Sequence, residues 1–177
     1  LTSALIDYYL PKFKSLESLD YGITTAQKTA RGIATTAAIL GYTGKPFKTL
    51  INGKTSNVYG WQGIQARKYQ KLGFRLLGNC DVPDLALFPK RYPSLKTVRF
   101  YAGLEIWFIH ITLWVLSWLV RIGLIRHLER LAPMLLRISF LFDWLGSSTS
   151  AFHMELSGKG KNNEKQLIKF ELIAKSG

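Results

Sequence analysis

The polar residues around position 29 form the strongest candidate binding site in the sequence. Gln27, Thr29 and Arg31 come directly before a segment rich in alanine and threonine that stops at Gly41. This pattern predicts a helix from Ala30 to Leu40 with Thr29 as its N-cap. Free backbone N–H groups at the helix N-terminus, together with the guanidinium, would suit a carboxylate or a phosphate. The alternative is that Arg31 is a structural anchor, paired with a neighbouring acidic residue.

Few other residues have a pattern suited to catalysis. Asp81 and Asp84 flank Pro83 and could act as an acid–base pair, but aspartates beside a proline are also common in turns, and we favour a turn. His110 could carry a proton inside an apolar segment, although a hydrogen-bonded core histidine is the simpler interpretation. Cys80 is the single cysteine and is interpreted as a packed structural thiol rather than a nucleophile. We therefore name no catalytic residue.

Metal and nucleotide-binding motifs are missing from the sequence. The three histidines and the cysteine do not show the spacing of metal ligands. No Gly-x-Gly-x-x-Gly follows a predicted strand, and no phosphate loop of the Gly-x-x-x-x-Gly-Lys-Ser/Thr kind is present. The nearest imitation, Gly41-Tyr-Thr-Gly-Lys-Pro46, has the wrong spacing and a proline where a helix should open. We expect this chain by itself to hold no metal and no cofactor.

Composition and charge narrow the class of protein. The chain has 177 residues, of which 47% are hydrophobic, which predicts one domain with a substantial core. Its net charge is +13, but the basic residues are scattered as on a solvated surface. The best local candidate for nucleic-acid binding, Gln65–Lys71, is short, so we expect no nucleic-acid partner. The charge could instead face an acidic partner surface, anionic lipid or a phosphorylated cofactor. The single cysteine fits a reducing compartment, so we expect a cytoplasmic protein, with peripheral membrane contact as an alternative.

Hydrophobic periodicity predicts an α+β fold. Leu1–Tyr9 has helical spacing, and Asn52-Gly53 is the favoured dipeptide of a tight hairpin. Three prolines from Pro83 to Pro93 argue against a helix before Lys96. Alternation of apolar and polar residues predicts strands at Ser18–Thr25 and Leu95–Tyr101. Further strands are predicted on both sides of the hairpin turn, at a short segment, and around the polar loop near Gly160: Phe47–Ile51, Thr55–Tyr59, Leu72–Leu77, Ala151–Ser157 and Gln166–Ala174. We expect a mixed, mostly antiparallel sheet with helices packed on one face.

A pair of long apolar helices is also predicted, from Leu104 to about Ile125 and from about His127 to Leu145. Three interpretations of the first helix are open: a core or dimer-interface helix, a helix lying on a membrane surface, or a membrane span. Glu105, His110 and Arg121 interrupt its apolar run, and its three tryptophans share one stripe instead of marking both ends. We favour the core or dimer-interface helix.

Three sequence blocks carry a family resemblance. They are Leu1-Thr-Ser-Ala-Leu5, the segment Thr29–Phe47, and Asn79–Asp84 continuing through Arg99–Glu105. Together with their spacing they make essentially the whole chain similar to saccharopine dehydrogenase-like oxidoreductases. In that family a nucleotide-binding Rossmann half precedes the point where this chain begins. The resemblance therefore implies the second, substrate-binding and dimerisation domain, inactive in isolation, with NAD(P) expected for the full-length protein.

The resemblance also implies where a ligand would sit. In that family a dinucleotide and an amino-acid-like substrate meet in the cleft between the two domains, so the turn from Thr29 to Gly32 becomes the expected lining of that cleft. We expect substrate-binding residues at Gln27, Thr29, Arg31, Asn79 and Arg99. The expected partners are the chain's own Rossmann domain and a second copy, bound through Leu104–Leu145. The alternative is a membrane-associated or scaffolding domain that has lost dehydrogenase activity, because the long apolar helices resemble a partly membrane-associated branch of the family.

Overall fold

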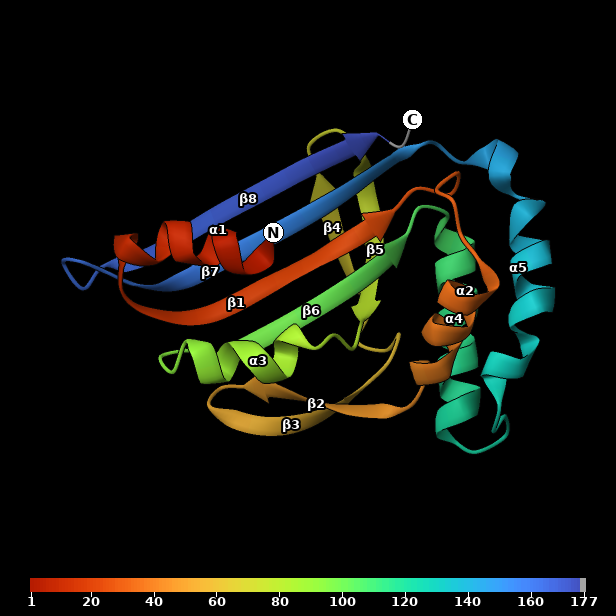
Figure 1. The fold of residues 1–177 in the computed structure, drawn as a ribbon, viewed down its shortest axis with the longest axis horizontal. Coiled ribbons are helices and arrows are strands. Elements are labelled where there is room, and N and C mark those ends of the chain that lie inside the picture. The colour runs from red at the N-terminus through yellow and green to blue at the C-terminus, as the bar shows by residue number, and fades with distance from the viewer. Residues whose placement is uncertain (176–177) are drawn as a thin grey trace.

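A six-stranded mixed sheet is the centre of the computed structural model, which describes residues 1–175. Its strands lie in the order β4-β5-β6-β1-β7-β8. β1 and β6 run parallel, and the other neighbouring strands run antiparallel (Figure 1). The strands are β1 (Phe13–Thr25), β4 (Gln65–Tyr69), β5 (Gly73–Asn79), β6 (Thr97–Leu104), β7 (Thr149–Gly160) and β8 (Lys165–Lys175). The predicted α+β fold with a mixed, mostly antiparallel sheet is confirmed.

The predicted hairpin forms a second, two-stranded sheet. β2 (Pro46–Ile51) pairs with β3 (Lys54–Tyr59). The turn residues Asn52 and Gly53 have φ angles of 51° and 76°, which is the conformation that a tight two-residue hairpin turn requires. The hairpin is attached to the main sheet because the Gly53 amide donates to the Lys96 carbonyl at 2.7 Å.

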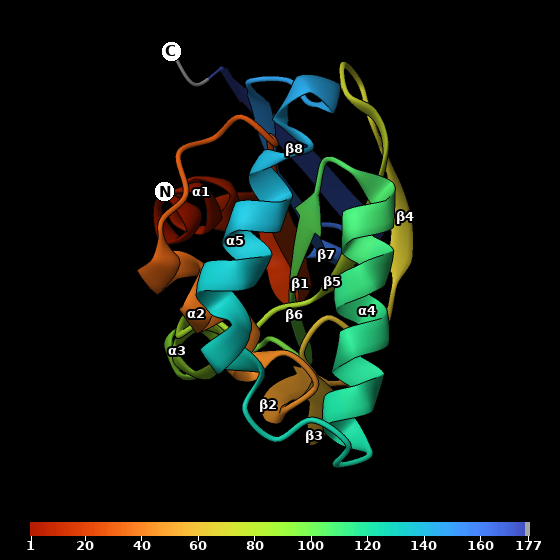
Figure 2. The same ribbon diagram turned by 90° about the vertical axis from the view of Figure 1, so that its right-hand side faces the viewer.

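Five α-helices lie in two groups among the described residues. α1 (Thr2–Tyr9) and α3 (Asp84–Arg91) lie side by side over one face of the sheet, whereas α2 (Ile33–Tyr42), α4 (Trp107–Arg121) and α5 (Ala132–Phe140) gather beyond the ends of β1 and β6 (Figures 1 and 2). The prediction that helices pack on one face of the sheet thus holds for α1 and α3 but not for α2, α4 and α5, which lie beyond the ends of β1 and β6. The 3-10 turns η1 (Leu10–Lys12), η2 (Leu128–Leu131) and η3 (Asp143–Leu145) extend the helical segments.

The long apolar helix pair was predicted wrongly. α4 ends at Arg121, and Gly123 follows with a φ of 81°, a conformation that stops a helix. The second segment divides into η2, the nine-residue α5 and η3, so its apolar residues do not form one continuous helix. Within residues 1–175, no helix has the length and apolar character needed to cross a membrane.

Two elements, α3 and β4, form where no helix or strand was predicted. α3 forms although Pro89 lies inside it, because Leu85 and Phe88 are buried against the core and Pro83 stands at the N-cap, where its lack of an N–H costs little. β4 forms from the basic segment that we considered for nucleic-acid binding. There Arg67 bonds to Glu155 of β7 at 2.7 Å, so part of its basic character is neutralised.

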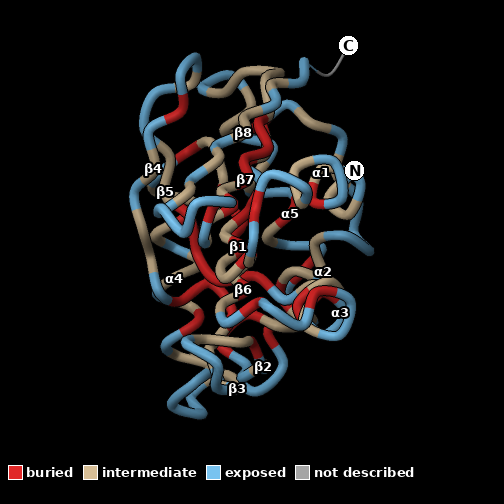
Figure 3. Tube along the Cα trace, turned by 90° about the vertical axis from the view of Figure 1, so that its left-hand side faces the viewer, coloured by how far each residue is buried: buried red, intermediate tan, exposed pale blue. Residues whose placement is uncertain are grey.

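The sheet curls so that β4 lies across β7 and β8. The Tyr69 hydroxyl is 2.7 Å from Nδ1 of His153, and the Gln70 amide donates to Glu171 at 3.1 Å. The core on the other face packs residues of β1 such as Leu19 and Tyr21 against α1 and α3. Figure 3 shows the buried segments concentrated along the central strands.

Candidate functional site

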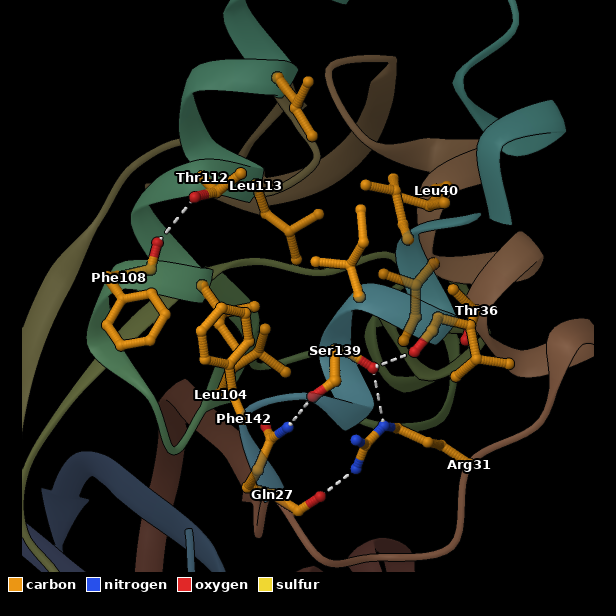
Figure 4. A pocket seen from close by; sticks show the side chains of 16 residues that line it. Gln27, Arg31, Thr36, Leu40, Leu104, Phe108, Thr112, Leu113, Ser139 and Phe142 are labelled. Atoms are coloured by element: carbon orange, nitrogen blue, oxygen red, sulfur yellow. Dashed lines mark hydrogen bonds between the residues drawn. The ribbon is translucent and has the colours of Figure 1, made fainter. Parts of the chain in front are cut away.

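An apolar cavity of about 350 Å³ lies between α2, α4 and α5 (Figure 4). α2 and α5 pack on each other, and α4 closes the opposite wall against the end of β6. The lining is mostly aliphatic and aromatic, with five polar or charged exceptions at Gln27, Arg31, Ser139, Thr36 and Thr112. The lining residues are Gln27, Arg31, Thr36, Ile39, Leu40, Leu104, Phe108, Ile109, Thr112, Leu113, Leu116, Leu135, Leu136, Ile138, Ser139 and Phe142.

Gln27 forms part of the polar end of this cavity. Its side-chain amide donates to the Ser139 carbonyl at 2.8 Å and to Oδ1 of Asp143 at 3.0 Å. Its backbone amide donates to Oε2 of Glu105 at 2.8 Å. Gln27 is buried, so these contacts fix the segment after β1 onto α5 and the start of α4.

Arg31 lies beside Gln27 and has partners at each of its nitrogen atoms. Nη2 forms an ion pair with Asp143, Nη1 donates to the Gln27 carbonyl, and Nε donates to the Ser139 hydroxyl at 3.1 Å. The guanidinium carbon also lies 4.5 Å from the centre of the Phe140 ring. These contacts support the structural-anchor interpretation of Arg31.

The predicted cap at Thr29 is wrong. α2 begins at Ile33 with Gly32 as its N-cap, so Arg31 lies before the helix and not in its first turn. The Thr29 hydroxyl instead lies 3.5 Å from the Ser150 hydroxyl. Contacts to α5 and to the start of β7 hold this segment away from helical geometry, and the expected anion site at a helix N-terminus is not formed there.

Glu105 organises the same end of the cavity. Its Oε2 accepts the backbone N–H groups of Gln27 and Ser147, both at 2.8 Å, and its Oε1 lies 3.4 Å from Arg75. Burial alone would raise the pKa of Glu105, but the two backbone donors and the Arg75 guanidinium hold that pKa below its ordinary value. This carboxylate is therefore an ionised anchor that joins three separate segments.

Asn79 and Arg99 form a second, separate group. They lie on the neighbouring strands β5 and β6, where Arg99 donates to Oδ1 of Asn79 at 2.7 Å. Asn79 is buried, and its backbone amide donates to the Gln62 carbonyl at 2.9 Å. Neither residue is among those that line the cavity. Of the five predicted substrate-binding residues, Gln27 and Arg31 thus line the cavity, Thr29 lies outside its lining beside Ser150, and Asn79 and Arg99 form a separate pair.

The other candidate residues have structural environments. Asp84 opens α3 and accepts the Thr2 hydroxyl at 3.0 Å. The Cys80 thiol lies 3.1 Å from the Tyr42 hydroxyl, and burial raises its pKa to about 11, so little thiolate forms near neutral pH. His110 is fully buried beside Trp61, as predicted, but the predicted hydrogen bond is missing, because neither ring nitrogen has a partner among the described residues. Within the same residues, no cluster of side chains could hold a metal ion.

Sequence reasoning missed the α5 side of the site. Asp143 and Ser139 contact Gln27 and Arg31 from more than 100 positions away along the chain. The available signals were the isolated charges Glu105 and Asp143 beside apolar runs, because a charge next to buried segments usually has a partner. The sequence does not reveal which partner that is.

Comparisons with known proteins support a resemblance in fold. No family model and no curated protein matches the chain. Among solved structures, the apo histidine-tagged saccharopine dehydrogenase (L-Glu forming) from Saccharomyces cerevisiae matches with a TM-score of 0.61 and 9% sequence identity. The match covers 98% of this chain and 56% of that chain. The chain therefore has a fold similar to that of part of a saccharopine dehydrogenase.

Proposed function

We propose that this chain is the substrate-binding and dimerisation domain of a saccharopine dehydrogenase-like oxidoreductase. The observation that carries the proposal is the cavity between α2, α4 and α5, situated in a fold similar to part of a saccharopine dehydrogenase. Cavities of this size with a few polar groups at one end are typical of small-molecule sites. Gln27 and Arg31 lie at that polar end, so two of the residues expected near the substrate border the proposed site.

The redox cofactor in this proposal, NAD(P), binds to a separate Rossmann domain. The chain contains no glycine-rich strand–turn–helix that could hold a pyrophosphate. Alone it should therefore bind NADPH no more tightly than about 1 mM, or roughly 4 kcal/mol. Isothermal titration calorimetry checks this expectation, and a dissociation constant in the micromolar range would contradict the assignment of the cofactor to another domain.

Dimerisation is proposed through the face formed between Leu104 and Leu145. This segment exposes many large apolar side chains, and exposed apolar surface of this kind is typical of an interaction site. They include Trp107, Trp118, Ile122, Leu124, Met134, Phe140, Leu141 and Trp144. Sedimentation equilibrium at about 100 μM should detect self-association, because even an interface near −6 kcal/mol is populated at that concentration.

The same face supports a second candidate function, attachment to a membrane surface. Trp107 and Trp144 are 67% and 77% exposed, and Arg126, Arg130 and Arg137 are exposed on the same segment. Exposed aromatic side chains together with exposed cations on one segment are typical of proteins that lie in the lipid interface. Co-sedimentation with vesicles of anionic phospholipid distinguishes the two functions. Binding that Trp107→Ser and Trp144→Ser abolish, in a protein that sediments as a monomer, would favour the membrane function.

A further inference from the structure

We infer that the cavity between α2, α4 and α5 takes a neutral, apolar ligand and not an anionic, amino-acid-like one. This inference rests on the proposed function, because it assumes that the cavity is the ligand site, and it adds the chemical class of the ligand.

Arg31 is the only charged residue among the described residues that line the cavity. Its charge is already matched by Asp143, its Nε is bonded to Ser139, and its face is covered by Phe140. A carboxylate entering the cavity would have to displace Asp143, leaving that carboxylate partly buried without its partner. Removing one partner of such a pair is costly, so an anion gains little from Arg31.

The uncharged polar groups of the lining are also engaged. Both contacts of the Gln27 side-chain amide are made within the protein, to the Ser139 carbonyl and to Asp143. Each of the three hydroxyls donates to a carbonyl: Thr36 to Gly32 at 3.0 Å, Thr112 to Phe108 at 2.9 Å, and Ser139 to Leu136 at 2.7 Å. A polar ligand would therefore lose its bonds to water on entry without finding free donors in the cavity.

The volume and the walls fit a ligand of moderate size. Leucine side chains from three helices and Phe108 line most of the surface. An engineered apolar cavity of about 150 Å³ holds one benzene molecule, so a cavity of about 350 Å³ has room for on the order of a dozen carbon atoms. A neutral lipid-like molecule with a short chain, such as a medium-chain alcohol or ester, has the matching chemistry.

The experiment uses the whole chain and the neutral probe N-phenyl-1-naphthylamine, whose fluorescence rises in an apolar site. Dodecanol and dodecanoate compete with the probe at about pH 8, where the acid is ionised. We expect dodecanol to displace the probe at a concentration at least about tenfold lower than dodecanoate. Equal competition by the two would overturn the inference about the ligand's charge while leaving the cavity as the ligand site.

A cavity-filling variant tests the location separately. Leu113→Trp, which places an indole in the cavity, should weaken probe binding by about tenfold or more. The matched control is Val115→Trp, on the exposed side of the same helix, which should bind the probe like the wild type. If Leu113→Trp does not fold, Thr112→Trp repeats the test at an exposed position on the cavity rim. Unchanged binding in a folded cavity variant would contradict the proposed ligand site itself.

Discussion

His110 should make the stability of this protein depend on pH in a defined way. The side chain is fully buried in α4, with its ring 5.3 Å from the centre of the Trp61 ring. Burial lowers the pKa of His110 from its ordinary value of 6.5 to about 4. The unfolded chain therefore binds a proton at this residue below about pH 6.5, whereas the folded protein does so only near pH 4.

The sign and the size of the effect follow from this difference. A histidine whose folded pKa is lowered contributes stability that is complete above the unfolded pKa and is lost as the pH falls toward the folded pKa. Between about pH 7.5 and 5 the free energy of unfolding should fall by roughly 2 kcal/mol because of His110 alone, approaching about 3 kcal/mol near pH 4. Glu105 and Glu155, whose folded pKa values are lowered, and His153, whose pKa burial also lowers, destabilise the protein in the same direction on acidification.

The assay is urea denaturation of the wild type and of His110→Leu at both pH values. Because other groups also titrate, the informative quantity is the difference between the two proteins in their loss of stability. The variant should lose about 2 kcal/mol less on acidification, and near pH 7.5 it should be no less stable, because leucine removes a buried polar ring without a partner. The control is Val115→Leu, at an exposed position of the same helix that carries no titratable group, which should lose as much stability as the wild type. An equal loss in His110→Leu and the wild type would refute the reasoning.

Two further predictions concern stability. Replacing Arg31 by Ala should lower the free energy of unfolding by about 2 kcal/mol, because it leaves the partly buried Asp143 without its ion pair. The affinity for a neutral probe should stay nearly unchanged once the loss of folding is corrected for. Denaturation and probe titration of Arg31→Ala and Arg31→Lys check both expectations, and a loss of affinity without a loss of stability would assign Arg31 to ligand binding instead. Gly22→Ala should destabilise the protein by about 2 kcal/mol or more, because a Cβ atom there would lie 2.4 Å from the Tyr101 carbonyl oxygen. Gly41→Ala is the matched control, since nothing lies within 4 Å of a Cβ at that position in α2, and it should raise stability by about 0.5–1 kcal/mol. Thermal melting measures both glycine variants, and similar melting temperatures for the two would contradict the close approach at Gly22.

Local sequence determined most of the strands and the hairpin turn of this protein, but not β4. Alternation located most of β1 and β6, because a half-buried strand needs an apolar residue at every second position. Short apolar segments and the polar loop near Gly160 located β5, β7 and β8. Asn52-Gly53 located the hairpin, since few other dipeptides adopt two consecutive positive φ angles. These features depend on residues that are close together in the chain, and the α+β class followed from them.

The tertiary structure decided the helices and the site. Burial of Leu85 and Phe88 outweighs the cost of Pro89 inside α3. The positive φ of Gly123 ends α4 earlier than the apolar sequence predicted. Arg31 meets Asp143 only because α5 returns beside the segment after β1, which no local pattern specifies. That contact converts a predicted anion site into a neutral anchor, because a charge can bind a ligand only where the fold has not already paired it.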